Sequence, residues 1–255
     1  GVQTYALPIS LTIEDAADFS FAIDGYFGVE LDAGTDNLVV RAANMLSDAT
    51  GQRPRGRLTL TKDLPIASGI GGGSADAAAA LKGLNALWRA GLDTDQLAMI
   101  ARSLGADVPM CVHGVPLRAR GIGDGINPAP AWPDGAAIVL ANPGVPVETP
   151  DVFRALTVRD SPPLPPLPAA WDDLAHLVDW LSATRNDLAA PAIRVAPIIA
   201  ETLSALRQTP GCRLARMSGS GATCFALYDD EEQAARAASL LAGHPAARWV
   251  MSGPL

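Results

Sequence analysis

The stretch Pro-Ile-Ala-Ser-Gly-Ile-Gly-Gly-Gly-Ser-Ala-Asp-Ala-Ala-Ala, residues 65–79, is the most informative part of this chain. It lies between a predicted strand, residues 58–61, and an alanine-rich predicted helix that runs through Trp88 and is closed by Gly91. Glycine permits positive φ and close approach of backbone N–H groups, and the amides and dipole at a helix start favour an anion. The stretch therefore predicts a phosphate-binding cradle, with a flexible linker or a tight turn as the alternative.

Eight residues form the predicted cradle: Pro65, Ser68, Gly69, Ile70, Gly71, Gly72, Gly73 and Ser74. The two serines offer hydroxyl groups to a phosphate oxygen or to a metal. No GxxxxGK[ST] pattern occurs in the chain, which excludes a Walker-type loop, and the glycine spacing does not fit the GxGxxG dinucleotide fingerprint. The cradle thus belongs to another class of phosphate binder.

The cradle resembles the second motif of the GHMP kinases, in its triple-glycine form. Residues 104–109, Leu-Gly-Ala-Asp-Val-Pro, resemble the family segment whose Asp is taken as the catalytic base. Residues 215–223, Ala-Arg-Met-Ser-Gly-Ser-Gly-Ala-Thr, resemble its third, glycine-rich motif. Residues 36–38 and 185–188 also resemble stretches of these enzymes, so the similarity runs in order from about residue 11 to the end.

The resemblance implies a two-lobed α+β GHMP kinase fold. We expect a truncated ATP-binding lobe with a mixed sheet and helices over residues 1–131, and a ferredoxin-like α/β sandwich with helices on one sheet face over residues 132–255. The boundary is placed in residues 127–134, which are dense in Pro and Ala. The implied activity is ATP-dependent phosphorylation, with Mg²⁺, of the 2-hydroxyl of 4-diphosphocytidyl-2-C-methyl-D-erythritol in non-mevalonate isoprenoid synthesis.

Asp107 is the predicted catalytic residue. Gly105 is expected to end the preceding helix and Pro109 to favour extended geometry at Val108, which would hold Asp107 in a short rigid turn. Such a carboxylate can take or orient a hydroxyl proton during phosphoryl transfer. The alternative is that Asp107 caps its own turn.

A second glycine-rich loop is implied to close the site, and it comprises Ser218, Gly219, Ser220 and Gly221. Turn chemistry alone is the other explanation for two glycines between two strands. Lys62, at the end of a predicted strand, is expected to be a solvated lysine, with contact to the nucleotide as the alternative.

Composition and charge limit the partners of the chain. Asp and Glu number 27 against 19 Lys and Arg, for a net charge of −8, which disfavours nucleic acid as a partner. No run of about 18 apolar residues predicts a membrane span, and no signal peptide is recognised, so the cytoplasm is the expected compartment. Cys111, Cys212 and Cys224 are expected to be reduced core thiols, and the three histidines lack metal-binding spacing.

Local patterns predict several further elements. Residues 11–13 and 19–23 alternate as strands of an antiparallel sheet, and a helix with Asp36 or Asn37 as its cap follows. One continuous helix is expected over residues 193–208.

The start of the sequence departs from the family. GHMP kinases of this kind begin with a Pro-Ala-Lys-(Ile/Leu)-Asn strand and an Asp-Gly-Tyr-His stretch, and neither is present; residues 24–27, Asp-Gly-Tyr-Phe, are not assigned a substrate-binding role. We expect the chain to lack the N-terminal segment and to be poorly active, because the missing lysine would stabilise charge. Residues 1–10 are set aside as a non-native segment, with an ordinary first strand as the alternative.

Three alternatives to this function stay open. The first is another GHMP kinase, of the homoserine or mevalonate type, and the second is a non-catalytic nucleotide-binding module. The third, a nucleic-acid-binding α+β domain, is disfavoured by charge. Apart from ATP and the small-molecule acceptor the sequence predicts no partner, and it does not give the oligomeric state.

Overall fold

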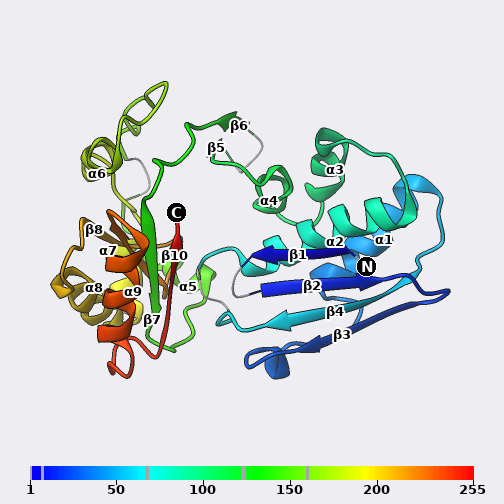
Figure 1. Ribbon diagram of the computed structural model, residues 1–255, viewed down its shortest axis with the longest axis horizontal. Helices are drawn as coiled ribbons and strands as arrows, with labels where there is room; N and C mark the ends of the chain where they lie inside the picture. Colours follow the sequence, from blue (N-terminus) through cyan, green and yellow to red (C-terminus); the bar gives the residue numbers. More distant parts are fainter. Residues whose placement is uncertain (1, 7–8, 67–68, 122–124, 159–160) are drawn as a thin grey trace. The chain divides into compact units, whose positions relative to one another are not determined.

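The computed structural model describes residues 2–6, 9–66, 69–121, 125–158 and 161–255 (Figure 1). Its contacts divide the chain into two compact units. The N-terminal unit comprises Gly1–Leu64 and Gly71–Pro128, and the C-terminal unit comprises Pro65–Ile70 and Ala129–Leu255. The first part of the predicted cradle therefore packs with the C-terminal unit, although it directly precedes a helix of the N-terminal unit.

The N-terminal unit contains a four-stranded sheet in the order β1-β2-β4-β3. Its strands are β1 (Val2–Ala6), β2 (Ile9–Glu14), β3 (Phe19–Asp24) and β4 (Gly56–Lys62). β2 is antiparallel to β1 and to β4, whereas β3 is parallel to β4. The antiparallel prediction for β3 was wrong, because a helix lies between β3 and β4 in the chain and a crossover connection of this kind joins parallel strands.

The segment that was set aside also proves to be part of the sheet. β1 pairs along its whole length with β2, so leaving residues 1–10 out of the fold was wrong. The alternative of an ordinary first strand holds for residues 2–6.

Helices cover the sheet of the N-terminal unit, and a small hairpin completes the unit. The elements are η1 (Gly28–Glu30), α1 (Leu38–Thr50), α2 (Gly72–Trp88), α3 (Thr94–Ala101), α4 (Val108–His113), β5 (Leu117–Arg120) and β6 (Gly125–Pro128). The Asn37 side chain accepts a hydrogen bond from the Val39 N–H at 2.9 Å, which confirms the predicted cap of α1. The C-cap of α2 is Arg89 in the left-handed region, so Gly91 is not its stop.

The C-terminal unit is built on an antiparallel sheet in the order β10-β7-β9-β8. Its elements are β7 (Ala137–Asn142), α5 (Thr149–Arg154), α6 (Leu174–Ser182), α7 (Ala189–Val195), α8 (Ile198–Gln208), β8 (Leu214–Met217), β9 (Cys224–Tyr228), α9 (Glu231–Leu241) and β10 (Trp249–Pro254). Val139 packs in one core with Ile199 of α8, and Ile138 packs in the opposite core with Leu177 of α6. Helices therefore cover both faces of this sheet, not one face as expected.

The predicted helix over residues 193–208 is interrupted. α7 and α8 are bent by 120° relative to each other, and the bend lies at Ala196 and Pro197, between the two helices. Proline has no N–H to donate and its ring clashes with the preceding turn, so a continuous helix cannot form there. Among the described residues no single helix has the length and apolar composition for a membrane span; only α7 and α8 taken together pass that test.

Candidate active site

The first turn of α2 presents an uncapped helix start. Gly71 is its N-cap, with φ 72° in the left-handed region, and no side chain caps the turn. A Cβ atom on Gly71 would meet nothing within 4 Å. The first N–H groups of a helix have no partner within the helix, so the amides at the head of this 17-residue helix are available to an anion.

Directly beneath this turn lies a buried ion pair. The Lys62 Nζ is 2.5 Å from the Asp76 Oδ2, and the two residues are 3% and 5% exposed. A Cβ on Gly72 would lie 3.2 Å from the Lys62 Nζ and 2.7 Å from the Leu64 Cδ2. The backbone at Gly72 thus lies close to the Lys62 ammonium group, and glycine allows this approach because it has no Cβ.

The prediction of a solvated Lys62 was therefore wrong. Gly56, Leu58, Leu60 and Lys62 are the buried residues of β4 and alternate with more exposed neighbours. Because successive side chains of a strand point to opposite faces, this alternation places Lys62 on the core side and could have been read from the sequence.

Burial raises the pKa of the Asp76 carboxyl above its usual value, and the charge and hydrogen bond of Lys62 oppose that shift. Asp76 Oδ1 is buried and has no hydrogen-bond partner among the described residues. A carboxylate in this state depends on its single cationic partner to stay ionised.

Asp107 is the N-cap of α4, and α4 packs against α2. The Asp107 side chain is exposed and makes no capping hydrogen bond, so the alternative in which it caps its own turn does not hold. Val108 is the first residue of α4 and Pro109 the second; the expected extended geometry of Val108 was wrong, because proline is well accepted in the first helical turn.

Cys111 lies on α4, which follows Asp107 and packs against α2, the helix that carries Asp76. Burial raises the pKa of the Cys111 thiol; the Asp107 and Asp76 carboxylates raise it further, and Lys82 of α2 lowers it. One thiol thus responds to charges from both helices. Within the N-terminal unit the predicted base, Asp107, therefore lies at the start of a helix that packs against α2.

In the C-terminal unit the two glycine-rich segments touch backbone to backbone. The Ser218 Oγ donates a hydrogen bond to the Gly69 carbonyl at 3.0 Å. A Cβ on Gly69 would lie 2.4 Å from the Gly221 carbonyl oxygen, and one on Gly219 would lie 2.6 Å from the Gly69 carbonyl oxygen. Both segments need glycine at this contact.

The residues of the predicted cradle are thus divided between the units. Gly71, Gly72, Gly73 and Ser74 form the head of α2, whereas Pro65, Gly69 and Ile70 pack with the C-terminal unit. Ser68 lies outside the described residues.

Two residues that sequence reasoning missed hold the second glycine-rich loop. The Asn186 Nδ2 donates to the carbonyls of Met217 at 3.1 Å and Gly219 at 2.8 Å. The hydroxyls of Thr149 and Ser220 are 2.8 Å apart. Asn186 belongs to the Arg-Asn-Asp-Leu stretch that resembles the family, which was a usable signal, whereas nothing in the sequence around Thr149 pointed to this contact.

The remaining candidates do not form a metal site. The described residues contain no group of three or more His, Cys, Asp or Glu arranged to hold a metal ion. The three cysteines are free thiols, but only Cys224 is buried, and burial raises its pKa to about 12. Cys111 and Cys212 are half-buried, and each packs against the edge of a hydrophobic core.

Comparisons with known sequences point the same way. The family model of the GHMP kinases N terminal domain matches residues 37–115, and that of the GHMP kinases C terminal matches residues 167–244. The 4-diphosphocytidyl-2-C-methyl-D-erythritol kinase of Cereibacter sphaeroides is 50% identical over 238 residues, which cover 91% of this chain and 81% of that protein. The enzyme of the same name from Paramagnetospirillum magneticum is 48% identical over 247 residues, with 96% of this chain and 85% of that protein covered.

Solved structures resemble the chain over nearly its whole length. A crystal structure of 4-(cytidine 5'-diphospho)-2C-methyl-D-erythritol kinase matches with a TM-score of 0.75 and 32% identity, covering 98% of this chain and 87% of that one. Homoserine kinase from Cytophaga hutchinsonii matches with a TM-score of 0.72 at 17% identity, covering 96% and 84%. At that identity the second match supports the fold alone.

Proposed function

The chain belongs to the GHMP kinase family, and on that premise we propose that it transfers the γ-phosphoryl group of ATP to the 2-hydroxyl of 4-diphosphocytidyl-2-C-methyl-D-erythritol. It is an ATP-dependent small-molecule kinase of isoprenoid synthesis. The acceptor, the hydroxyl group and the residue roles below are the proposal. We also propose a cytoplasmic location.

One observation carries the assignment of the reacting groups. The exposed Asp107 is the N-cap of α4, and α4 packs against α2, the helix that begins with the glycine-rich turn; this packing supports a role for Asp107 beside that turn. The proposed base and the proposed phosphate-binding turn thus belong to adjacent helices of one compact unit.

The head of α2 fits a nucleotide phosphate. The N–H groups of Gly72, Gly73 and Ser74 would bind phosphate oxygens, because no side chain caps that turn and the Gly71 position is open. ATP supplies the transferable γ-phosphoryl group when it is bound. We include Mg²⁺ in the proposal, with the Ser74 hydroxyl as an oxygen ligand of the kind that Mg²⁺ prefers.

Asp107 would accept the proton of the attacking hydroxyl. Its carboxylate has no hydrogen bond or ion pair among the described residues, so it is free to orient an acceptor hydroxyl. We propose that the Ser218–Gly221 loop also contributes to nucleotide binding, and its backbone contact with Gly69, two residues before Gly71, supports this role. Positioning and charge stabilisation supply most of the catalysis in phosphoryl transfer.

We further propose that a polypeptide limited to these 255 residues turns over slowly. It contains no Pro-Ala-Lys-(Ile/Leu)-Asn segment, and loss of one charge-stabilising group commonly lowers the rate about 100-fold or more. Preceding the chain with a lysine-bearing strand of that sequence should restore turnover. Equal turnover with and without the added strand would refute this part of the proposal.

A panel of acceptors with ATP tests the function. Phosphorylated product, followed by ³¹P NMR, is expected with 4-diphosphocytidyl-2-C-methyl-D-erythritol and not with homoserine or mevalonate. A preference for either of the other alcohols would overturn the acceptor. ATP binding by calorimetry without product from any acceptor, with the lysine-bearing strand added, would favour a non-catalytic nucleotide-binding module.

A further inference from the structure

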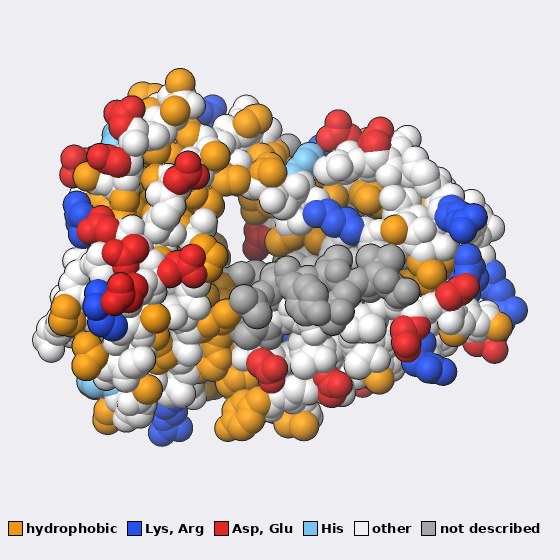
Figure 2. All heavy atoms as spheres, in the orientation of Figure 1, with side chains coloured by type: hydrophobic (Ala, Val, Ile, Leu, Met, Phe, Trp, Pro, Cys, Tyr) orange, Lys and Arg blue, Asp and Glu red, His pale blue; other side chains and the backbone are white. Residues whose placement is uncertain are grey.

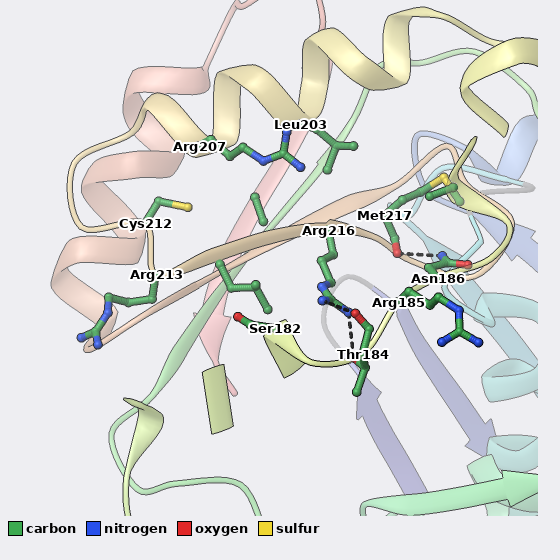
Figure 3. A pocket seen from close by; sticks show the side chains of 13 residues that line it. Ser182, Thr184, Arg185, Asn186, Leu203, Arg207, Cys212, Arg213, Arg216 and Met217 are labelled. Atoms are coloured by element: carbon green, nitrogen blue, oxygen red, sulfur yellow. Dashed lines mark hydrogen bonds between the residues drawn. The ribbon is translucent and has the colours of Figure 1, made fainter. Parts of the chain in front are cut away.

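The C-terminal unit holds a cavity of about 600 Å³ along the edge strand β8. Figure 3 shows β8 running through it, with Arg207 and Leu203 reaching in from α8 on one side and Ser182 and Thr184 on the other. Arg213 and Cys212 lie at one end, and Asn186 and Met217 at the other. Its volume is in the range of small-molecule sites.

The lining of this cavity is strongly basic. It includes Arg185, Arg207, Arg213 and Arg216, and no Asp or Glu, in a chain whose net charge is −8. On the face of the molecule in Figure 2, acidic side chains are prominent over the C-terminal unit and few Lys or Arg side chains lie among them. A basic concavity in an acidic protein concentrates anions from solution.

Two of the four guanidinium groups lack a carboxylate partner. Arg213 contacts both oxygens of Asp229, and Arg185 is paired with Asp187. Arg216 donates only to neutral oxygens, namely the Thr184 hydroxyl and the carbonyls of Thr184 and Leu181. Arg207 makes no ion pair or hydrogen bond in the part of the chain that the structure describes.

Arg207 is exposed, so its guanidinium is open to an anion from solution, and the Arg216 guanidinium contacts neutral oxygens alone. Burial lowers the pKa of Arg216, as expected for a positive charge without a counter-ion. Arg207 lowers the pKa of the Cys212 thiol against the larger, opposite effect of burial, so its charge lies close to the cavity wall. Guanidinium groups suit phosphate oxygens, and the cavity has room for more than one phosphate.

We propose that this cavity is a second anion site, which takes an organic phosphate or diphosphate independently of the cradle at the head of α2. Arg207 supplies the free charge, and Arg213 and Arg216 add to the positive potential. Leu203 and Met217 offer apolar surface to the organic part of such a ligand.

The site has a direct connection to the second glycine-rich loop. Asn186 and Met217 line the cavity, and Asn186 also holds the Gly219 carbonyl. An anion in the cavity that contacts Asn186 therefore acts on the Ser218–Gly221 loop through the Asn186 hydrogen bonds, and through the loop on the affinity for ATP. This step rests on the proposed role of that loop in nucleotide binding.

Cysteine alkylation gives a test that reads the cavity and the cradle separately. The probe is inorganic pyrophosphate, with sodium chloride at equal ionic strength as the reference, and iodoacetamide labelling is followed by mass spectrometry. Cys212 lines the cavity and Cys111 lies beside Asp107, so each thiol reports on one site. At a pyrophosphate concentration ten times its dissociation constant for the cavity, only about one site in eleven stays empty. We therefore expect labelling of Cys212 to slow about tenfold.

Arg207→Gln should abolish the protection of Cys212, with rates compared with and without pyrophosphate in each variant. Arg236→Gln is the matched control: Arg236 is an exposed helical arginine of the same unit, paired with Glu232 and outside the cavity, and this variant should keep the protection. Protection of Cys111 alone would place pyrophosphate only in the cradle and overturn the second site. Protection of Cys212 that survives Arg207→Gln would also overturn it.

The connection to the loop is measured through the KM for ATP. Pyrophosphate competing at the cradle alone would raise the KM equally in the wild type and in Arg207→Gln. With pyrophosphate present, we expect the KM for ATP of the wild type and that of Arg207→Gln to differ about fivefold. Equal values, with Cys212 protected, would refute the connection and leave the anion site standing.

Discussion

The buried pair of Lys62 and Asp76 makes the strongest energetic prediction. Their side chains are 4% and 6% exposed, and the Lys62 Nζ and Asp76 Oδ2 lie 2.5 Å apart beneath the first turn of α2. The perturbation is a double-mutant cycle of Asp76→Leu, Lys62→Met and the two combined. Each single change leaves one ionisable group buried without its partner, whereas the double change leaves two apolar side chains.

The magnitudes follow from burial. Asp76→Leu should lower the free energy of unfolding by about 3–5 kcal/mol, because an uncompensated ammonium group is left in the core. The double variant should lie within about 2 kcal/mol of the wild type or above it, since well-packed apolar residues commonly replace a buried ion pair without loss. The loss in Asp76→Leu is a large part of a typical stability of roughly 5–15 kcal/mol.

Guanidinium unfolding, followed by circular dichroism and by tryptophan fluorescence, is the assay. Arg53→Gln is the matched control, since Arg53 forms an exposed ion pair with Asp18 whose loss should cost less than about 1 kcal/mol. The reasoning fails if Asp76→Leu costs no more than Arg53→Gln. It fails equally if the double variant loses the sum of the two single losses, because the pair would then not be coupled.

Three further predictions follow from the same contacts. In Lys62→Met, burial holds the pKa of Asp76 above its ordinary value of 3.8, so the folded state binds more protons than the unfolded state. The free energy of unfolding should therefore fall as pH rises above about 4. A flat pH profile relative to the wild type would contradict this. Gly69→Ala should lower the free energy of unfolding, measured by thermal unfolding, by at least about 1 kcal/mol more than Gly71→Ala does. Both glycines have positive φ, but only a Cβ at position 69 would meet the Gly221 carbonyl. Equal losses of stability would refute the contact. Asn186→Ala should speed hydrogen exchange in residues 218–221 with little change in α9, and uniform exchange in both segments would refute a local role.

Local chemistry was predictable where side chains bond to nearby backbone. Asn37 caps α1, and Asp93 with Gln96 forms a capping box at the start of α3. Both contacts lie within one helical turn, so the sequence contains all the partners. Pro197 carried an equally local signal that was overlooked, and the break between α7 and α8 follows from it.

Other features depend on packing that no local pattern contains. The left-handed Arg89 at the end of α2 is such a case, because a non-glycine residue rarely takes that conformation. Asp76 was read as part of a phosphate motif, yet its partner is Lys62, which lies on a different element and is brought to it by the packing of α2 on the sheet. The basic cavity at β8 likewise gathers arginines from three separate segments.

Roles in the candidate site depended on the resemblance more than on residue chemistry. Gly69 was recognised as necessary, but its contact with Gly219 and Gly221 joins segments about 150 residues apart in the chain, which only the family could suggest. The catalytic role of Asp107 and the nucleotide-binding role of the cradle stay predictions.

Asp107→Asn tests the central proposal most directly. In the chain preceded by a lysine-bearing strand, phosphorylated product from ATP and 4-diphosphocytidyl-2-C-methyl-D-erythritol is measured by ³¹P NMR, and ATP affinity by calorimetry. We predict a fall in kcat of about 100-fold or more, with the Kd for ATP nearly unchanged, because Asp107 acts on the hydroxyl and not on the phosphates. An unchanged kcat would show that Asp107 is not the base and would contradict the account of this site.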